Sequence, residues 1–198
     1  MSMIAENMIG GNGKKERPAS DFYPTPREAT IVLLNLIAPF LKSGGVIWEP
    51  ACGENDMVDV MREEGYPVIG TDVLDGTDFL TAQIPEGTEW IITNPPFSLA
   101  EQFIRRAYET GLPFAFLLKS QFWHAAGRLP LFRECRPSII APLTWRPDFN
   151  FKDTGNHGKP LMDVLWCVWL PRNGLLADDN TTRYIPLQKP LQRKKNAV

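Results

Sequence analysis

Apolar positions along the chain alternate between helix-like spacing and short continuous runs. In residues 28–41 and 99–108 the apolar side chains recur every three or four positions, which predicts two helices that each bury one face. Apolar runs bounded by glycine or proline predict buried strands instead. The predicted strands are 46–49, 68–71, 90–92, 112–118, 138–143 and 164–170, and further helices are predicted at 57–64 and 124–135, the last interrupted at Pro130. This alternation is typical of an α/β domain.

The first strand–helix–strand unit carries a candidate nucleoside site. Small residues, including Ala51 and Gly53, lie at the turn between strand 46–49 and helix 57–64, where backbone can approach a ligand closely and the helix presents free N–H groups. Asp72 ends the next strand, about 20 residues after the turn, where a doubly wound sheet holds the two hydroxyls of a ribose. The alternative is that Asp72 is an exposed acid at a strand end.

A rigid turn, Asn94-Pro95-Pro96-Phe97, ends the strand at 90–92. Neither proline can donate a hydrogen bond within a sheet, so the strand must stop there. The amide oxygen of Asn94 and a proline carbonyl can accept the two N–H bonds of a planar amine while the ring of Phe97 stacks on its face. The turn therefore predicts a site for a planar group that bears an amine. A strand that simply ends at two prolines, followed by a buried phenylalanine, is the alternative.

The two ends of the chain differ in composition from its middle. Residues 1–20 are rich in glycine, proline and charge and are expected to form a flexible arm, and residues 172–198 are expected to form a C-terminal tail. Residues 21–171 have the length of one globular domain. Within them, the segment 144–160 is polar and carries interleaved aromatic residues, and a connection of that length between strands is usually functional or disordered.

Composition narrows the range of functions. The formal net charge is −2, so a nucleic-acid partner would need a local basic patch rather than a field from the whole protein. Three widely spaced cysteines and two histidines favour reduced thiols and offer no metal site. No apolar stretch approaches the roughly 20 residues of a membrane span, so we expect a cytoplasmic protein without a membrane partner. The sequence carries no signal for an oligomeric state.

Five short motifs, in order, resemble those of the S-adenosylmethionine-dependent DNA adenine-N6 methyltransferases, particularly the small phage and prophage type. The segment 22–26 resembles the family's N-terminal cofactor motif, and residues 49–53 resemble its glycine-rich motif. Asp72 resembles the ribose-binding acid, residues 78–79 the adenine-side motif, and residues 94–97 the catalytic motif. The resemblance covers residues 21–170. One position departs from it, since Asn55 stands where the family usually has a second glycine.

The resemblance implies a Rossmann-like class I methyltransferase fold, with a mostly parallel seven-stranded sheet whose last strand is antiparallel, helices on both faces and a crevice at the carboxyl ends of the strands. It implies S-adenosylmethionine as the cofactor and adenine, flipped out of duplex DNA, as the substrate, in a bacterial or phage-infected host cell. The implied catalytic residues are Asn94, Pro95, Pro96 and Phe97, and the implied cofactor-binding residues are Tyr23, Thr25, Pro26, Glu49, Pro50, Ala51, Gly53, Asp72, Asp78 and Phe79.

The segment 144–160 is the expected target-base loop of such an enzyme, because only it and the two tails remain once strands and helices are assigned. Phe149 and Phe151 are expected to stack on the flipped base, and Arg146 and Lys152 to contact phosphates. The alternative is that the two rings cap the core.

Other substrates remain open. The catalytic motif also occurs in methyltransferases that act on guanine in rRNA or on glutamine in proteins, and Asn94 could hold the amine of cytosine as well as that of adenine. A further alternative is a catalytically impaired module that binds the cofactor and nucleic acid.

Overall fold

The computed structural model describes residues 23–152, 160, 162–171 and 181–191. The expected arm 1–20 lies outside these residues, as do Asp21, Phe22 of the N-terminal motif, and residues 153–159 of the expected target loop.

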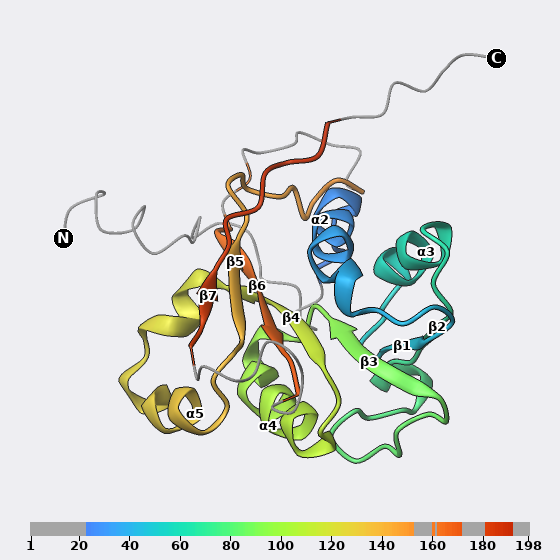
Figure 1. Cartoon of the computed structure of the whole chain (residues 1–198), viewed down its shortest axis with the longest axis horizontal. Helices are drawn as coiled ribbons and strands as arrows, with labels where there is room; N and C mark the ends of the chain where they lie inside the picture. Colours follow the sequence, from blue (N-terminus) through green and yellow to red (C-terminus); the bar gives the residue numbers. More distant parts are fainter. Residues whose placement is uncertain (1–22, 153–159, 161, 172–180, 192–198) are drawn as a thin grey trace.

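A seven-stranded sheet in the order β2-β1-β3-β4-β6-β5-β7 forms the centre of the molecule (Figure 1). β1, β2, β3 and β4 run parallel, β6 is antiparallel to its neighbours β4 and β5, and β7 is parallel to β5. This confirms the predicted fold class. The strands are β1 (Val46–Glu49), β2 (Val68–Gly70), β3 (Thr88–Thr93), β4 (Phe114–Lys119), β5 (Ile139–Pro142), β6 (Val164–Trp169) and β7 (Arg183–Tyr184).

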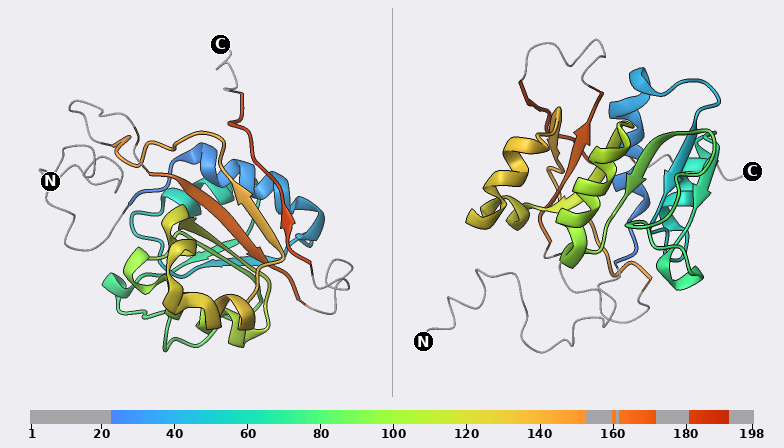
Figure 2. Two further views of the ribbon diagram at one scale, coloured as in Figure 1. Left: turned by 90° about the vertical axis from the view of Figure 1, so that its left-hand side faces the viewer. Right: turned by 90° about the horizontal axis from the view of Figure 1, so that it is seen from below.

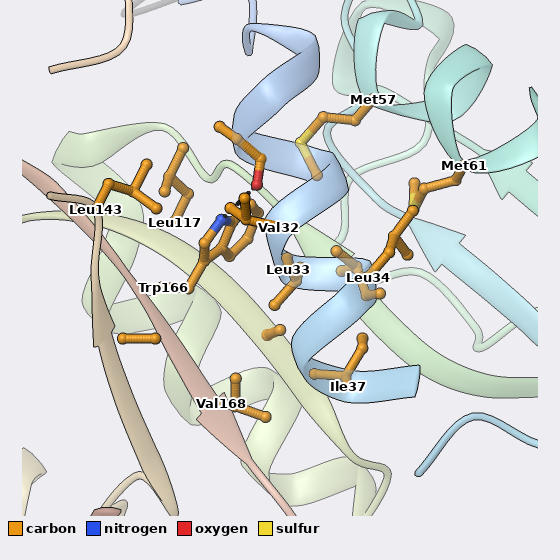
Figure 3. Close-up of a cluster of buried hydrophobic side chains, with 14 of the residues drawn as sticks. Val32, Leu33, Leu34, Ile37, Met57, Met61, Leu117, Leu143, Trp166 and Val168 are labelled. Carbon is orange, nitrogen blue, oxygen red and sulfur yellow. Dashed lines mark hydrogen bonds between the residues drawn. The ribbon is translucent and has the colours of Figure 1, made fainter. Parts of the chain in front are cut away.

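Helices cover both faces of this sheet (Figure 2). The α-helices are α2 (Arg27–Ile37), α3 (Asp56–Glu63), α4 (Ala100–Thr110) and α5 (Leu129–Glu134), and the 3-10 turns are η1 (Ala38–Phe40), η2 (Val73–Asp75), η3 (Phe97–Leu99), η4 (Ser120–His124) and η5 (Ala126–Arg128). Two buried clusters lie between the helices and the sheet. α2 and α3 pack on one face, where Trp166 Nε1 donates a 2.9 Å hydrogen bond to the Ala29 carbonyl (Figure 3). Helices α4 and α5 pack on the other face.

Successive side chains along a strand point to opposite faces of the sheet and so belong to the two clusters in turn. On β3, Trp90 and Ile92 belong to the cluster under α2, whereas Ile91 belongs to the cluster under α4. The apolar stretch of β4 from Phe114 to Leu118 is buried throughout. Burial on both faces explains why these strands read as continuous apolar runs in the sequence.

Prolines account for two differences between the predicted and observed helices. α2 ends at Ile37, and the residues around Pro39 form the 3-10 turn η1 instead of continuing to residue 41. The predicted helix 124–135 is wrong at its start, because α5 begins at Leu129 and residues 120–128 form 3-10 turns. Pro130 lies in the first turn of α5, where no N–H is needed, so it begins the helix rather than interrupting it.

Part of the expected C-terminal tail returns to the sheet. Arg183–Tyr184 pair with Ile139 and Ile140 of β5, and Leu187 bridges to Leu143. A two-residue strand is too short to show an alternating pattern, so the sequence gives no sign of it.

The carboxyl ends of β1, β3 and β4 meet at one edge of the sheet, because the three strands are parallel neighbours. The chain passes from β1 to β2 on one side, and β3 lies on the other side. The strand order therefore reverses next to β1, which is where ligands bind in open α/β sheets.

Candidate active site

A pocket of about 440 Å³ lies at this edge of the sheet. Its wall combines the N-terminal segment, the turn after β1, the end of β2 with η2, the loop before β3 and the turn after β3. Of the predicted site residues it includes Tyr23, Thr25, Glu49, Pro50, Ala51, Gly53, Asp72, Asp78, Phe79, Asn94 and Pro96. Pro26, Pro95 and Phe97 lie outside the wall, as do Arg146, Phe149, Phe151 and Lys152. The five separate motifs thus converge on one cavity.

The wall also contains residues that the motifs do not indicate. Val73 and Leu74 follow Asp72 and leave 64% and 81% of their surfaces exposed. Cys52 lies in the turn after β1, and Glu54 and Asp56 stand near the start of α3. Their only signal in the sequence is that they adjoin motif residues.

The turn after β1 contains two residues with left-handed backbone. Gly53 has φ 49° and Asn55 has φ 67°, and Asn55 is the one described residue other than glycine with a positive φ. Asparagine tolerates this conformation better than most side chains. The Asn55 carbonyl accepts the Asp59 N–H at 2.8 Å, so α3 starts normally after the turn. The departure from glycine at this position therefore leaves the turn intact.

Asp72 holds the ends of β1 and β2 together. Its two carboxylate oxygens accept backbone N–H bonds from Gly53 and Leu74, each at 2.9 Å, and only 8% of the residue is exposed. This burial rules out the exposed strand-end alternative. Each oxygen keeps a second lone pair for a ligand.

Asp78 and Phe79 take different places in the loop before β3. Asp78 is exposed, and its carboxylate accepts the Leu80 N–H at 2.9 Å. Phe79 is buried, with its ring 5.2 Å from the ring of Trp48 and 4.8 Å from that of Phe103. Phe79 therefore forms an apolar floor under the pocket, next to the Asp78 carboxylate.

Glu49 is a buried acid with one unused oxygen. Its Oε1 accepts hydrogen bonds from the Ala51 N–H at 3.1 Å and from the Thr93 hydroxyl, whereas Oε2 is buried and has no partner among the described residues. Burial raises the pKa of Glu49 to about 8, against the lowering effect of its hydrogen bonds to Thr93 and Ala51. A carboxyl group in this state favours a positively charged ligand in the pocket, because a cation would stabilise its ionised form.

The side-chain amide of Asn94 is fixed in one orientation. Its Nδ2 donates to the Tyr23 carbonyl and to the Thr25 hydroxyl, both at 3.0 Å. A backbone carbonyl can only accept, so the amide nitrogen must point toward Tyr23 and the oxygen away from it. The Oδ1 atom is buried and has no partner in the part of the chain that the structure describes. The turn thus presents a hydrogen-bond acceptor in the pocket wall.

One of the two proline carbonyls of the turn is also unused. The Pro96 carbonyl accepts the Leu99 N–H at 2.9 Å, whereas no hydrogen bond to the Pro95 carbonyl occurs among the described residues. The Pro95 carbonyl is therefore available as a second acceptor next to Asn94 in the chain, although Pro95 lies outside the pocket wall.

Aromatic rings and a lysine surround the outer side of the turn. The rings of Tyr23 and Phe97 are 5.4 Å apart, and the Lys119 ammonium at the end of β4 lies 3.9 Å from the centre of the Phe97 ring and 5.0 Å from that of Tyr23. Such cation–π contacts attract the ammonium to the rings. No motif indicates Lys119. Its position at the end of an apolar strand, next to the strand that ends in the turn at residues 94–97, is the signal that could have found it.

Of the residues expected to bind the target base, Lys152 and Phe151 lie together, with the Lys152 ammonium 5.9 Å from the centre of the Phe151 ring. Phe149 is 4% exposed and belongs to the core under α2, with its ring 6.2 Å from that of Tyr23. It supports Tyr23 from the core side, so here the expectation of a base-stacking ring is corrected to the core-capping alternative. Phe151 is 41% exposed. The two expected phosphate ligands are ion-paired, Arg146 with Asp163 at 2.7 Å and Lys152 with Glu54 at 2.8 Å and Asp56 at 2.6 Å.

No helix among the described residues is both long and apolar enough to cross a membrane, and no group of three or more His, Cys, Asp or Glu side chains among them could hold a metal ion.

Comparisons with known proteins bear on the fold. No protein-family model matches the sequence, and no curated protein matches it. Among solved structures, a protein from Listeria monocytogenes assigned to the class I S-adenosylmethionine-dependent methyltransferases is similar, with a TM-score of 0.57 and 15% identity over 88% of this chain and 68% of the other. A protein from Vibrio vulnificus assigned as a modification subunit of a type I restriction enzyme has a TM-score of 0.54 and 13% identity over 96% of this chain, which spans about half (51%) of that protein. The chain has the fold of the class I methyltransferases.

Proposed function

We propose that this protein transfers a methyl group from S-adenosylmethionine to the exocyclic N6 amine of adenine in DNA. The observation that carries the proposal is the buried Asn94 Oδ1, a fixed and unpartnered acceptor in the wall of a pocket whose other half is lined by acids.

The acidic half of the pocket suits the methyl donor. Asp72 has lone pairs left for ribose hydroxyls, and the exposed apolar side chains of Val73 and Leu74 offer a surface for an adenine ring. Glu49 Oε2 offers a buried carboxylate oxygen for the ammonium of the methionine part. When bound, S-adenosylmethionine supplies a methyl group made electrophilic by its positively charged sulfur.

The catalytic turn suits the methyl acceptor. Asn94 Oδ1 and the Pro95 carbonyl can each accept one N–H of the substrate amine, which leaves the nitrogen lone pair to point into the cofactor half of the pocket. The amine lone pair of adenine is delocalised into the ring, and two accepted hydrogen bonds favour the tetrahedral nitrogen that attacks. Orientation and fixed acceptors can carry much of such a barrier, so the site needs no strong base.

A base within a duplex cannot reach an atom as recessed as Asn94 Oδ1, so adenine must leave the stack to be methylated. In this proposal the ring of Phe97, the last residue of the turn, receives the base, and the Lys119 ammonium lies over the same ring. The Vibrio vulnificus relative, assigned as a restriction-modification subunit, supports DNA as the substrate class.

Mass analysis of nucleosides tests this function directly. DNA and RNA from cells that express the protein are compared with those from cells that express Asn94→Ala, with Asn35→Ala, an exposed asparagine on α2, as the matched control. We expect N6-methyladenine in DNA with the wild type and the control, and a loss of about a hundredfold or more with Asn94→Ala. Methylated cytosine, methylated RNA, or methylation that survives in Asn94→Ala would contradict the proposal.

A further inference from the structure

We propose that Thr25 is a positioning residue for Asn94, so that the segment from Tyr23 to Thr25 belongs to the catalytic centre and does more than contact the cofactor. This inference rests on the proposed function only in taking Asn94 Oδ1 as the acceptor of the substrate amine.

The two hydrogen bonds that Asn94 Nδ2 donates decide what the side chain offers the substrate. They are accepted by the Tyr23 carbonyl and the Thr25 hydroxyl, each 3.0 Å away, and Thr25 is 4% exposed. The last torsion of an asparagine side chain is broad and roughly two-fold. Rotation by half a turn would therefore exchange the nitrogen and oxygen with little intrinsic resistance. A flipped amide would present N–H groups to the substrate amine, which cannot then be held by two accepted bonds.

The Tyr23–Thr25 segment is itself fastened to the site. The Tyr23 ring lies 5.4 Å from Phe97 of the catalytic turn and 6.2 Å from Phe149 of the core, and the Lys119 ammonium lies over both Tyr23 and Phe97. These contacts join the N-terminal segment, the turn after β3 and the end of β4. They hold the Tyr23 carbonyl and Thr25 hydroxyl where the Asn94 amide can use them.

Thr25 also connects the two halves of the pocket. Its oxygen accepts from Asn94, and its own hydroxyl proton can be donated to a ligand because Thr25 lines the pocket. A hydroxyl that binds a cofactor and simultaneously orients Asn94 would align the acceptor amide in the cofactor-bound enzyme.

Kinetics can distinguish two roles for Thr25. If Thr25 orients Asn94, its loss lowers kcat, whereas if it only binds the cofactor, its loss lowers cofactor affinity. Thr25→Val keeps the shape of the side chain but removes the acceptor for Asn94 Nδ2. We expect kcat at saturating cofactor to fall about tenfold, the size of one lost hydrogen bond, and Thr25→Ser to restore it. Thr182→Val is the matched control, because the Thr182 hydroxyl makes one bond, to the Pro137 carbonyl at 2.8 Å, near the amino end of β5.

NMR can report on the side-chain amide of Asn94 independently of methyl transfer. In protein labelled with ¹⁵N asparagine, the side-chain NH₂ signals of Asn94, assigned through Asn94→Ala, should shift in Thr25→Val and return in Thr25→Ser, with no shift in Thr182→Val. Unchanged Asn94 signals in Thr25→Val would overturn the proposal, as would a loss of cofactor affinity with kcat intact. If the wild type methylates no DNA, the proposed function fails, whereas the NMR comparison still decides whether Thr25 orients Asn94.

Discussion

The Thr93 hydroxyl donates a hydrogen bond to the Glu49 carboxylate, which joins the end of β1 to the end of β3. The turns that follow these two strands have different roles in the proposed reaction. The turn after β1 faces the cofactor, and the turn after β3 faces the substrate. Glu49 is thus a structural link and, in the proposed reaction, also a cofactor ligand, and its protonation state bears on both roles.

Glu49 makes cofactor binding depend on pH. Its pKa of about 8 in the empty site means that it is largely protonated at pH 7, and a bound ammonium would lower that pKa, so binding should release a proton and strengthen as pH rises toward 8. Calorimetric titration with S-adenosylmethionine in buffers of different ionisation enthalpy measures the proton count. Glu49→Gln should bind more weakly and release no proton at this site. Binding to the wild type without proton release between pH 6 and about 7 would show that Glu49 does not meet the ammonium.

Asp72→Ala should affect both affinity and stability. Loss of an acceptor for the ribose hydroxyls should weaken cofactor binding about tenfold or more. The Gly53 and Leu74 N–H groups also lose their partners, so the free energy of unfolding should fall by about 1–3 kcal/mol. Calorimetry and urea unfolding measure the two effects, with Asp75→Ala, an exposed acid in η2, as the control. Unchanged affinity in a folded Asp72→Ala protein would move the cofactor elsewhere.

The two phenylalanines of the expected target loop should respond differently to truncation. Phe149→Ala removes a ring that is 4% exposed, so the free energy of unfolding should drop by about 3–5 kcal/mol. Phe151→Ala removes a ring that is 41% exposed and should change stability by less than about 0.5 kcal/mol. If Phe151 stacks on the flipped base, its loss should lower methylation at low DNA concentration. A large stability loss in Phe151→Ala with normal activity per folded molecule would remove it from the substrate site.

Substitutions of Asn55 test whether the turn after β1 requires the left-handed backbone conformation at this position. Asn55→Gly should keep cofactor affinity, because glycine adopts the same positive φ without strain. Asn55→Ala should cost about 1–2 kcal/mol of stability, because its Cβ disfavours the left-handed conformation. Thermal unfolding and cofactor titration of the two variants give the comparison. Equal stability of Asn55→Ala and the wild type would mean that the turn relaxes to another conformation.

Local chemistry explains which parts of the site could be predicted from the sequence. Gly53 permits a left-handed turn that most residues disfavour, and the two prolines after Asn94 restrict the backbone around them, so both turns are visible as motifs. The bond between Thr25 and Asn94, in contrast, joins residues far apart in the chain, and no spacing rule predicts it. The same holds for the ion pairs of Lys152 with Glu54 and Asp56. These two carboxylates neutralise the ammonium that the sequence analysis expected to contact phosphates.

The sequence also did not show which aromatic side chains of the segment 144–160 are buried. Phe149 and Phe151 are two residues apart in a segment without a regular period, and one lies in the core while the other faces outward. Short elements were missed for a related reason, since β7 and the turns η4 and η5 are too brief to repeat a pattern.

The antiparallel course of β6 brings both ends of the connection between β5 and β6 to the same edge of the sheet as the pocket. Leu143 and Val164 at those ends are joined by a backbone hydrogen bond of 3.3 Å. Doubling the length of a connection whose ends already meet costs only about 0.6 kcal/mol. The scaffold can therefore accept added length in this connection as long as Phe149 keeps its contact with Tyr23 and Lys152 keeps its ion pairs with Glu54 and Asp56. In the proposed enzyme, added length in this connection would change the substrate side of the pocket and leave the residues proposed to hold the methyl donor in place.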